Sequence, residues 1–228
     1  MVFGTLVQNR TRIRNPGVIK IGSKERIQRE LADRKQLIIE KSKELFFSRG
    51  FDNVSIQDIC DAIEYGKSAV YNLFESKEEI YGFVFVEAVQ ILADLLNEVD
   101  ASTVDLEDPL TEFTAKIYCF FKEYKPYYTA LFFFDFNHRA LLKIPDHIIR
   151  QKHLERERGA QPVYMVLNNG IETGVLRPFD IQEMINTYFA SLLGIINTFI
   201  IDQQDADPEA LREIMIRHAK IYGRGMQA

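Results

Sequence analysis

One stretch, residues 55–80, constrains the fold of this 228-residue chain more than any other. Ser55 is followed three positions later by Asp58, and Ser76 is followed in the same way by Glu79. Each pair has the spacing of a capping box, so each predicts a helix start, and a further short helix fits between them. Two short helices joined by a tight turn form the helix-turn-helix pattern, whose second helix enters the major groove of DNA.

The same spacing also fits two helices of an ordinary helical bundle. The composition of the second short helix separates the two interpretations, because its outward positions carry Lys67, Ser68, Tyr71 and Asn72. A helix needed only for packing does not require these side chains on its exposed side, whereas a helix that touches phosphates and base edges does. We therefore favour DNA binding.

Residues 34–80 resemble the N-terminal domain of tetracycline-repressor (TetR) type transcriptional regulators. The landmarks of this resemblance fall in register without gaps, and they are Ile38, Leu45, Phe46, Gly50, Phe51, Ser55, Asp58, Ile59, Ala62, Lys67, Tyr71, Phe74, Ser76, Lys77 and Glu78. The resemblance implies an all-α fold, with a three-helix DNA-binding domain followed by a larger helical domain for ligand binding and dimerisation.

Four positions of the helix-turn-helix depart from the family pattern. Glu64 stands where the family usually has a turn glycine, Gly66 replaces a serine cap, Ser68 a frequent glycine and Leu73 a common histidine. Glycine caps a helix almost as well as serine does. Glu64 is the costlier change, by about 1–2 kcal/mol, if its position needs a left-handed backbone.

The recognition helix supplies most of the predicted DNA contacts. Lys67 suits guanine or phosphate, Asn72 suits adenine or phosphate, and Ser68 suits either. The methyl group of Ala69 suits a thymine methyl, and Tyr71 is expected to reach a phosphate.

Four further residues complete the predicted DNA-binding set. Gln57 matches a base-contacting position of the family, and Ser55 lies at the start of the same helix. Arg34 is near the start of the first helix and within reach of a phosphate. Lys77 is in the first turn of the third helix start, where a helix N-terminus and a lysine can share a phosphate.

The charge distribution is uneven along the chain, whose net charge is −5. Residues 1–80 hold 14 Lys and Arg against 12 Asp and Glu, and the remainder holds 14 against 21. Within the first 35 residues the count is 9 against 3. This asymmetry suits DNA contact at one end and an acidic body that avoids DNA.

Residues 1–32 are predicted to be a basic, flexible N-terminal arm, because Pro16 and Gly17 interrupt any helix there. Such an arm either stays solvated or settles along phosphates or a minor groove. The segment from Lys24 onward alternatively extends the first helix. Residues 33–80 are predicted to form the DNA-binding domain, with a first helix over residues 33–48, and residues 81–228 the ligand-binding and dimerisation domain.

The helix predicted over residues 77–99 is too apolar to stand free, so it is expected to link the two domains as a lever. Beyond it, 11 aromatic residues fall between positions 113 and 136. Rings at this density make either a solid core or a cavity between helices, and the resemblance favours the cavity. The predicted ligand-binding residues are Phe113, Ile117, Phe120, Phe121, Tyr128, Phe132, Phe136 and Tyr164.

A long helical pattern spans residues 145–174, with a break or kink expected near Gly159 and Pro162. Its charged run, residues 150–158, is interpreted as a solvated face. Residues 184–201 carry no charge, yet their Asn, Thr and Ser side chains favour a helix buried in protein over one in a membrane. This helix and the last one, from about residue 208 to 222, are expected to pair with a second copy. The predicted dimer contacts are Tyr188, Ala190, Gly194, Ile195, Phe199 and Ile214.

Cys60 and Cys119 have no spacing typical of a disulfide framework or a metal site, and a reducing cytoplasm fits them. No nucleophile or acid–base constellation stands out, so no enzyme activity, cofactor, metal or membrane partner is predicted. The expected protein is a homodimeric repressor that a small, largely apolar effector releases from a near-palindromic operator in double-stranded DNA. The alternative is a helix-turn-helix protein that uses DNA as a platform for a protein partner, without a small-molecule inducer.

Overall fold

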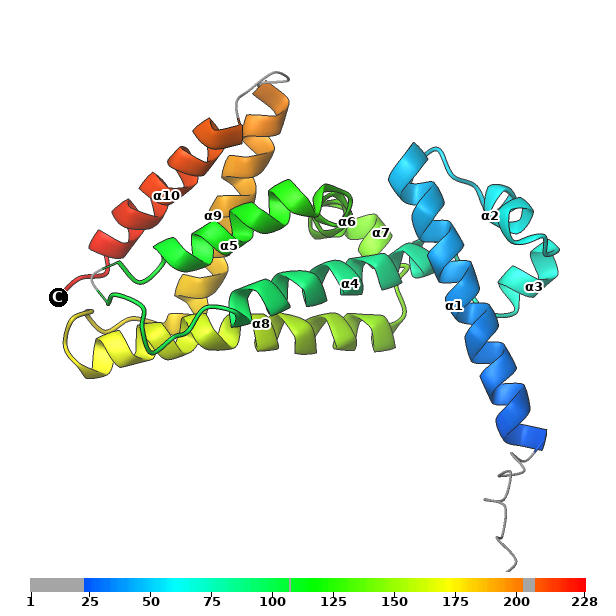
Figure 1. Ribbon diagram of the computed structural model, residues 1–228, viewed down its shortest axis with the longest axis horizontal. Coiled ribbons are helices and arrows are strands. Elements are labelled where there is room, and N and C mark those ends of the chain that lie inside the picture. The colour runs from blue at the N-terminus through cyan, green and yellow to red at the C-terminus, as the bar shows by residue number, and fades with distance from the viewer. Residues whose placement is uncertain (1–22, 107, 203–207) are drawn as a thin grey trace, which may run out of the picture.

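The structure is a computed structural model that describes residues 23–106, 108–202 and 208–228, so the first 22 residues of the predicted arm lie outside it. The predicted all-α fold is confirmed (Figure 1). The helices are α1 (Ser23–Arg49), α2 (Ile56–Ile63), α3 (Lys67–Tyr71), α4 (Lys77–Asn97), α5 (Thr111–Glu123), α6 (Lys125–Phe136), α7 (His138–Leu141), α8 (Asp146–Glu172), α9 (Ile181–Asp202) and α10 (Pro208–Arg224).

The first helix begins at Ser23, well before the start predicted at residue 33. Residues 23–32 are therefore helical, which corrects the flexible arm predicted as far as residue 32 and confirms the alternative that this segment extends the helix. An exposed ion pair between Arg26 and Glu30, one helical turn apart at 3.8 Å, lies on this extension.

Helices α1, α2 and α3 form one end of the molecule, and α9 and α10 lie at the other end (Figure 1). α1 braces the two short helices, because its buried Ile38 and Phe46 belong to the same apolar cluster as Ile59 and Val70. α4 leaves this end and continues into the body of the molecule, as expected for a link between the two parts.

In the body, α4 and α8 run side by side along most of their lengths (Figure 1). Gly159 allows their closest approach, because a Cβ atom at this position would lie 3.0 Å from both the Cα and the Cβ of Ala93. Gly159, which follows the charged run of α8, is thus a packing position and not a break.

α8 is continuous from Asp146 to Glu172 with Pro162 inside it, which excludes a break near residues 159–162, one of the two outcomes predicted there. A proline has no N–H, and it therefore leaves the carbonyl four residues earlier without its helical donor. In this protein that carbonyl belongs to Arg158, and it accepts a hydrogen bond from the side-chain amide of Asn97 at 3.0 Å. Tertiary packing replaces the missing bond, and the helix continues.

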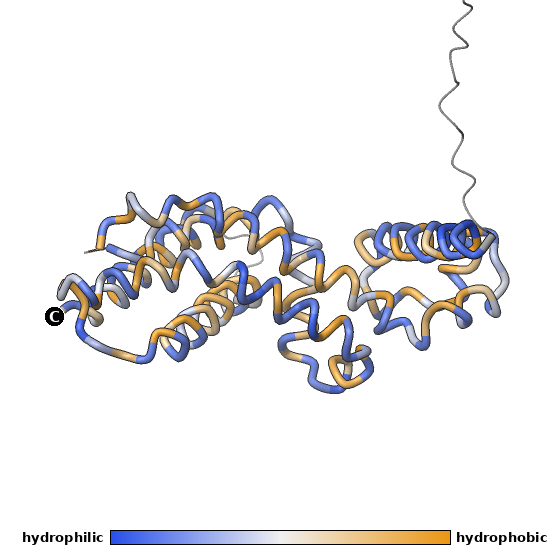
Figure 2. The backbone as a smooth tube through the Cα atoms, turned by 90° about the horizontal axis from the view of Figure 1, so that it is seen from below, coloured by the Kyte–Doolittle hydropathy of each residue, from blue (hydrophilic) through white to orange (hydrophobic). Residues whose placement is uncertain are grey.

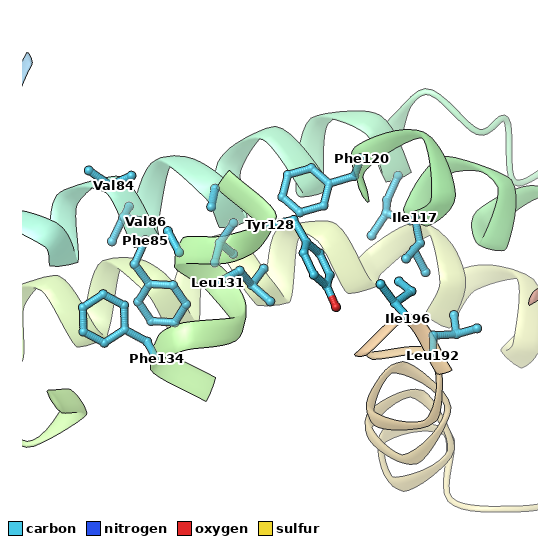
Figure 3. Packing of buried hydrophobic residues seen from close by; sticks show 14 of the residues in the cluster. Val84, Phe85, Val86, Ile117, Phe120, Tyr128, Leu131, Phe134, Leu192 and Ile196 are labelled. Atoms are coloured by element: carbon cyan, nitrogen blue, oxygen red, sulfur yellow. The ribbon is translucent and has the colours of Figure 1, made fainter. Parts of the chain in front are cut away.

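Aromatic rings fill much of the space between α4 and α6. Phe85 and Phe134 are fully buried, with ring centroids 4.9 Å apart, and Figure 3 shows them facing each other across the two helices. Figure 2 shows apolar and polar residues interspersed around the helices of both parts, the pattern of helices with one buried face. Within the described residues, no helix combines the length and the apolar character that a membrane crossing requires.

Candidate DNA-binding surface and ligand cavity

Helix α2 begins with the predicted capping box. The Ser55 hydroxyl accepts a hydrogen bond from the Asp58 backbone N–H at 3.2 Å, and the Asp58 carboxylate accepts one from the Ser55 N–H at 2.8 Å. The hydrogen bonds from Ser55 lower the pKa of Asp58, so the carboxylate stays charged at the positive end of the helix. The Ser55 side chain, predicted to bind DNA, is thus already used in fixing the helix start.

Helix α2 ends at Ile63, and its C-cap residue Glu64 has φ 57° and ψ 33° in the left-handed region. This is the position at which the sequence departs from the turn glycine of the family, so the condition under which Glu64 is a costly change is met. A residue with a Cβ atom is strained there, whereas glycine is not.

Replacing Glu64 by glycine is expected to raise the free energy of unfolding by roughly 0.5–1 kcal/mol, because relief of left-handed strain exceeds the extra chain entropy of glycine. Urea unfolding followed by circular dichroism measures the change. Glu64→Ala is the matched control, since it removes the carboxylate and keeps the Cβ atom. Equal stability of the two variants would contradict a backbone origin.

Helix α3 presents the predicted recognition surface to solvent. Val70 is fully buried and anchors the helix, while Tyr71 is 54% exposed. Lys67, Ser68 and Asn72 are exposed as well. These four polar side chains occupy the end of the molecule opposite α9 and α10, so this surface is available to a large partner (Figure 1).

Arg34 and Ala69 join the recognition surface through a shallow pocket between α1 and α3. The pocket has a volume of about 240 Å³, and its wall consists of Leu31, Arg34, Tyr65, Ser68, Ala69, Asn72 and Leu73. The Arg34 guanidinium lies over the Tyr65 ring, 5.9 Å from its centroid, which places the cation beside α3. Gln57 is exposed on α2, and its amide donates a hydrogen bond to Asp61 at 2.7 Å.

The position of Lys77 corrects its predicted role as a phosphate contact. Its ammonium group donates hydrogen bonds to the carbonyl oxygens of Phe51 and Val54, both at 2.8 Å, and lies 4.0 Å from the centroid of the Phe51 ring. Burial lowers the pKa of Lys77. The lysine therefore fastens the start of α4 to the loop between α1 and α2, and it belongs to the structural framework of the domain.

The DNA-binding end is joined to the body by a polar cluster of three residues from three helices. Lys43 of α1 donates to both carboxylate oxygens of Glu87 on α4 at 3.1 Å, and the Tyr127 hydroxyl of α6 donates to the same carboxylate at 2.7 Å. Burial and Glu87 together raise the pKa of Tyr127 to about 12. The Phe47 ring of α1 also packs edge-on against Tyr127, with centroids 5.0 Å apart.

A cavity of about 520 Å³ lies inside the body, between α4, α5, α6, α8 and α9. Its wall is mostly apolar and consists of Val89, Leu92, Ala93, Leu96, Ile117, Phe120, Tyr128, Leu131, Asp135, Phe136, Glu155, Arg156, Gly159, Ala160, Gln182, Ile185, Asn186, Phe189, Ala190 and Leu193. This volume is within the usual range of small-molecule sites.

Only part of the predicted ligand-binding set lies on the cavity wall. Ile117, Phe120, Tyr128 and Phe136 line it. The other predicted residues lie elsewhere: Phe113 is fully buried, Phe121 and Phe132 pack against Tyr128 with centroid distances of 5.1 and 6.2 Å, and Tyr164 is 42% exposed on α8. The sequence did not predict the parts of the cavity wall that α4, α8 and α9 contribute, because no local sequence pattern marks those residues.

Tyr128 is the most buried polar residue of the cavity wall. Its side chain is 4% exposed, and its hydroxyl has no hydrogen-bond partner among the described residues. Figure 3 shows the side chain pointing away from α6, with the hydroxyl at its far end. Burial raises the pKa of Tyr128, so the group is a neutral phenol that can both donate and accept a hydrogen bond.

The predicted dimer residues divide into two groups. Tyr188 is buried, its hydroxyl shares a hydrogen bond with Thr114 at 2.6 Å, and its ring stacks on His218 with centroids 5.5 Å apart. Tyr188 is therefore a core residue of its own subunit, which corrects its assignment to the interface.

The remaining predicted dimer residues lie at or near the surface of α9 and α10. Ala190 and Gly194 are exposed, Ile195 and Phe199 are half-buried, and Ile214 is 40% exposed. A Cβ atom at Gly194 would meet no other atom within 4 Å, so the space beside this residue is open.

Comparison with known proteins identifies the first part of the chain. The family described as "Bacterial regulatory proteins, tetR family" matches residues 38–82. The transcriptional repressor DhaR of a Mycobacterium species is 35% identical over 75 residues, which cover 33% of this chain and 36% of that protein. The uncharacterised regulator YhgD of Bacillus subtilis is 22% identical over 191 residues, which cover 81% of this chain and 80% of that protein.

Most of the chain has a counterpart among solved structures. The TetR family regulator PfmR of Thermus thermophilus superposes with a TM-score of 0.56 at 22% identity, covering 84% of this chain and 99% of that one. The match over residues 38–82 includes the capping box of α2, the recognition helix and the start of α4. Residues 38–82 thus match the tetR family of bacterial regulatory proteins, and the chain around them has an all-helical fold similar to that of solved regulators of this family.

Proposed function

We propose that this transcriptional regulator is a homodimeric repressor, which a small, largely apolar ligand releases from a near-palindromic operator. The observation that carries the proposal is the surface of α3, where Lys67, Ser68, Tyr71 and Asn72 are exposed while Val70 anchors the helix. These residue types make the phosphate and base-edge contacts of helix-turn-helix proteins. The repressor DhaR, 35% identical over 75 residues, supports the direction of regulation.

In the proposed domain organisation, residues 33–80 form the DNA-binding domain and residues 81–228 form the ligand-binding and dimerisation domain. Two copies related by a two-fold axis present two recognition helices, so the operator has two half-sites about one helical turn, or a multiple of it, apart. In each half-site Lys67 and Tyr71 hold the helix on the duplex. Arg34 adds a phosphate contact from α1.

Dimerisation is proposed to use the exposed faces of α9 and α10. Ala190 and Gly194 are four residues apart on α9, and such small residues allow the backbone of a partner helix to approach closely. Ile214 on α10 is 40% exposed and contributes apolar surface to the same contact. The open space around Gly194 supports this placement.

The effector is proposed to bind in the cavity of the body and to act on the DNA-binding domain through α6. One side of α6 lines the cavity with Tyr128 and Leu131, and the neighbouring Tyr127 binds Glu87, which is held by Lys43 of α1. A ligand that shifts α6 therefore shifts a helix attached to the DNA-binding domain. To change DNA affinity usefully, the ligand must bind one of the two positions of α6 with a free energy about 1–3 kcal/mol more favourable than the other.

Tyr127→Phe tests this route, because it removes the hydrogen bond to Glu87 and keeps the ring against Phe47. Binding of cavity ligand and operator is reciprocal, so operator DNA is expected to weaken ligand binding about 5- to 150-fold in the unmodified protein. In the variant this factor is expected to fall severalfold, while operator affinity without ligand stays nearly unchanged. Titration of the fluorescent probe N-phenyl-1-naphthylamine, with and without operator, measures the factor.

The matched control is Thr129→Ala, which changes an exposed side chain of the same helix that bonds only to the Lys125 carbonyl among the described residues. If operator DNA weakens probe binding by the same factor in Tyr127→Phe as in the unmodified protein, the coupling between ligand and operator does not depend on the polar cluster of Lys43, Glu87 and Tyr127.

The proposed function itself is tested by selecting genomic fragments with purified protein at near-physiological salt and footprinting the fragments that bind. One near-palindromic sequence, protected over two half-sites, is the expected result. Weak binding without sequence preference, collapsing as salt rises, would favour a protein that uses DNA as a platform for a partner.

A further inference from the structure

We infer that the first turns of α1, residues 24–33, are a second DNA-binding element, which contacts the backbone of the duplex that flanks each half-site. This inference goes beyond the proposed function and rests on it, because it requires a bound operator. The segment lies before residues 38–82, the part of the chain that matches the family. The family match therefore assigns it no role, and its own side chains have to indicate one.

This segment, the α1 extension, is an exposed helix that runs past the recognition helix. Every side chain from Lys24 to Arg34 is exposed. Leu31 and Arg34 share the shallow pocket with Ser68 and Asn72 of α3, and the residues before Leu31 continue beyond α3 (Figure 1). At 1.5 Å per residue, the extension adds about 15 Å of helix. Because the pocket joins the two surfaces, a duplex seated on α3 passes close to the extension.

One side of the extension continues the side of α1 that faces the interior of the DNA-binding end. In the folded part of α1 this side carries Ile38, which is fully buried, and Lys35, whose ammonium lies 4.7 Å from the centroid of the Phe83 ring. Lys24 and Leu31 fall in the same row, because they precede Lys35 by eleven and four residues. The side chains of the extension on this side are Lys24, Ile27, Gln28 and Leu31.

The acidic residues of the extension are on the other side of the helix. At 3.6 residues per turn, Glu25, Glu30 and Asp33 are each rotated by about 100° or more from Lys24. Arg26 is on that side as well and pairs with Glu30 at 3.8 Å. Lys24, in contrast, forms no ion pair with another described residue. The side that continues toward α3 is therefore positively charged and free of carboxylates.

Duplex DNA is the partner that this side of the extension fits. The Lys24 ammonium and the Gln28 amide suit phosphate oxygens, which are the commonest hydrogen-bonding partners of DNA-binding proteins. Ile27 and Leu31 are 52% and 45% exposed and supply apolar surface for the sugars between the phosphates. The charge is complementary to DNA, and the surface is continuous with α3 through the shared pocket. Contacts of this kind add affinity without reading the sequence.

Charge reversal at Lys24 tests this surface, and charge reversal at Arg29, on the other side of the same helix, is the matched control. Each full-length variant is titrated with two duplexes that carry the operator recovered by genomic selection. One duplex ends at the outer edges of the half-sites, and the other has about eight further base pairs on each side. Circular dichroism of the free variants checks that their helix content is unchanged.

On the extended duplex, Lys24→Glu is expected to weaken binding at least about tenfold and Arg29→Glu no more than about threefold, because charges that do not touch DNA are screened. On the short duplex both variants are expected to bind within about threefold of the unmodified protein. Hydroxyl-radical footprints are expected to extend about four base pairs beyond each half-site, the length of 15 Å of duplex, and to lose this flank in Lys24→Glu.

The possible failures remain distinct. Equal effects of the two charge reversals, or an effect of Lys24→Glu that is the same on both duplexes, would overturn the inference and leave the operator-binding repressor standing. If the unmodified protein selects no operator, the proposed function and the inference fall together. A double variant with Ile27→Ser and Leu31→Ser that loses self-association in sedimentation without DNA, and keeps full affinity for the extended duplex, would assign the surface to a second copy and also overturn the inference.

Discussion

Replacing Lys67 and Tyr71 together by alanine is expected to weaken operator binding by at least about 100-fold. Contacts of this kind contribute roughly 1–3 kcal/mol each, and the proposed dimer carries two copies of each residue. Both side chains are exposed on α3, while the buried Val70 that holds the helix is unchanged. The variant is therefore expected to fold and dimerise normally, and fluorescence anisotropy with labelled operator measures its affinity.

A double variant with Lys125→Ala and Tyr164→Ala is the matched control, because it removes the same two residue types from exposed positions of the body. Its operator affinity is expected to stay within about twofold of the unmodified protein, since charges far from the DNA are screened. Lys67→Ala alone is also expected to lower the slope of log affinity against log salt by about 1 per half-site, if its contact is to phosphate. Unimpaired operator binding by the variant with Lys67→Ala and Tyr71→Ala would refute the assignment of α3 as the recognition helix.

Replacing Lys77 by methionine is expected to lower the free energy of unfolding by about 2–3 kcal/mol. The substitution keeps the apolar stem over the Phe51 ring and removes two hydrogen bonds from an ammonium group to backbone carbonyls, which are stronger than bonds between neutral groups. Urea unfolding followed by circular dichroism measures the loss.

The salt dependence of operator binding distinguishes this structural role from the phosphate contact that the sequence predicts. Below the temperature at which the variant unfolds, its salt slope is expected to equal that of the unmodified protein, because the ammonium is committed to the Phe51 and Val54 carbonyls. Lys41→Met removes an exposed lysine of α1 that pairs only with Glu44 among the described residues, and it is expected to leave stability nearly unchanged. A reduced salt slope of operator binding, together with unchanged stability, in Lys77→Met would show that Lys77 contacts a phosphate.

The DNA-binding end follows closely from local sequence signals. A capping box needs only Ser55 and Asp58, three residues apart, and the buried side of α3 needs only the spacing that includes Val70. The departure at Glu64 marked a position whose cost depended on a left-handed backbone, and the structure shows that this backbone is present. Interactions between residues close in the chain are present in the sequence as spacing, and these could be predicted.

The roles of Lys77 and Tyr188 show the limit of such signals. Both lie on helices that were predicted, yet the partners that define their roles are the Phe51 carbonyl and the Thr114 hydroxyl, 26 and 74 residues away. A lysine in the first turn of α4 can either contact a DNA phosphate or donate hydrogen bonds to backbone carbonyls, so its position in the sequence does not distinguish the two roles. Only the fold decides which partner is present.

The residues that line the cavity could be predicted from the sequence only in part. The concentration of aromatic residues between positions 113 and 136 indicated where large side chains accumulate, and four of the eight predicted residues lie on the wall. The same rings also fill the solid core around Phe85 and Phe134, so ring density alone does not separate core from cavity.

By itself, the sequence determined the helical class, the capped helix starts, the exposed chemistry of α3 and the uneven distribution of charge, because these depend on neighbours within a few turns. Only the tertiary structure decided that α8 continues through Pro162, that Lys77 binds backbone carbonyls, that the charged residues of the cavity wall are paired, and that the Tyr128 hydroxyl has no hydrogen-bond partner among the described residues. The physical reason is common to all four. The stability of a helix containing proline, the availability of an ammonium group and the neutrality of a cavity depend on groups supplied by other helices, such as the Asn97 amide that binds the Arg158 carbonyl.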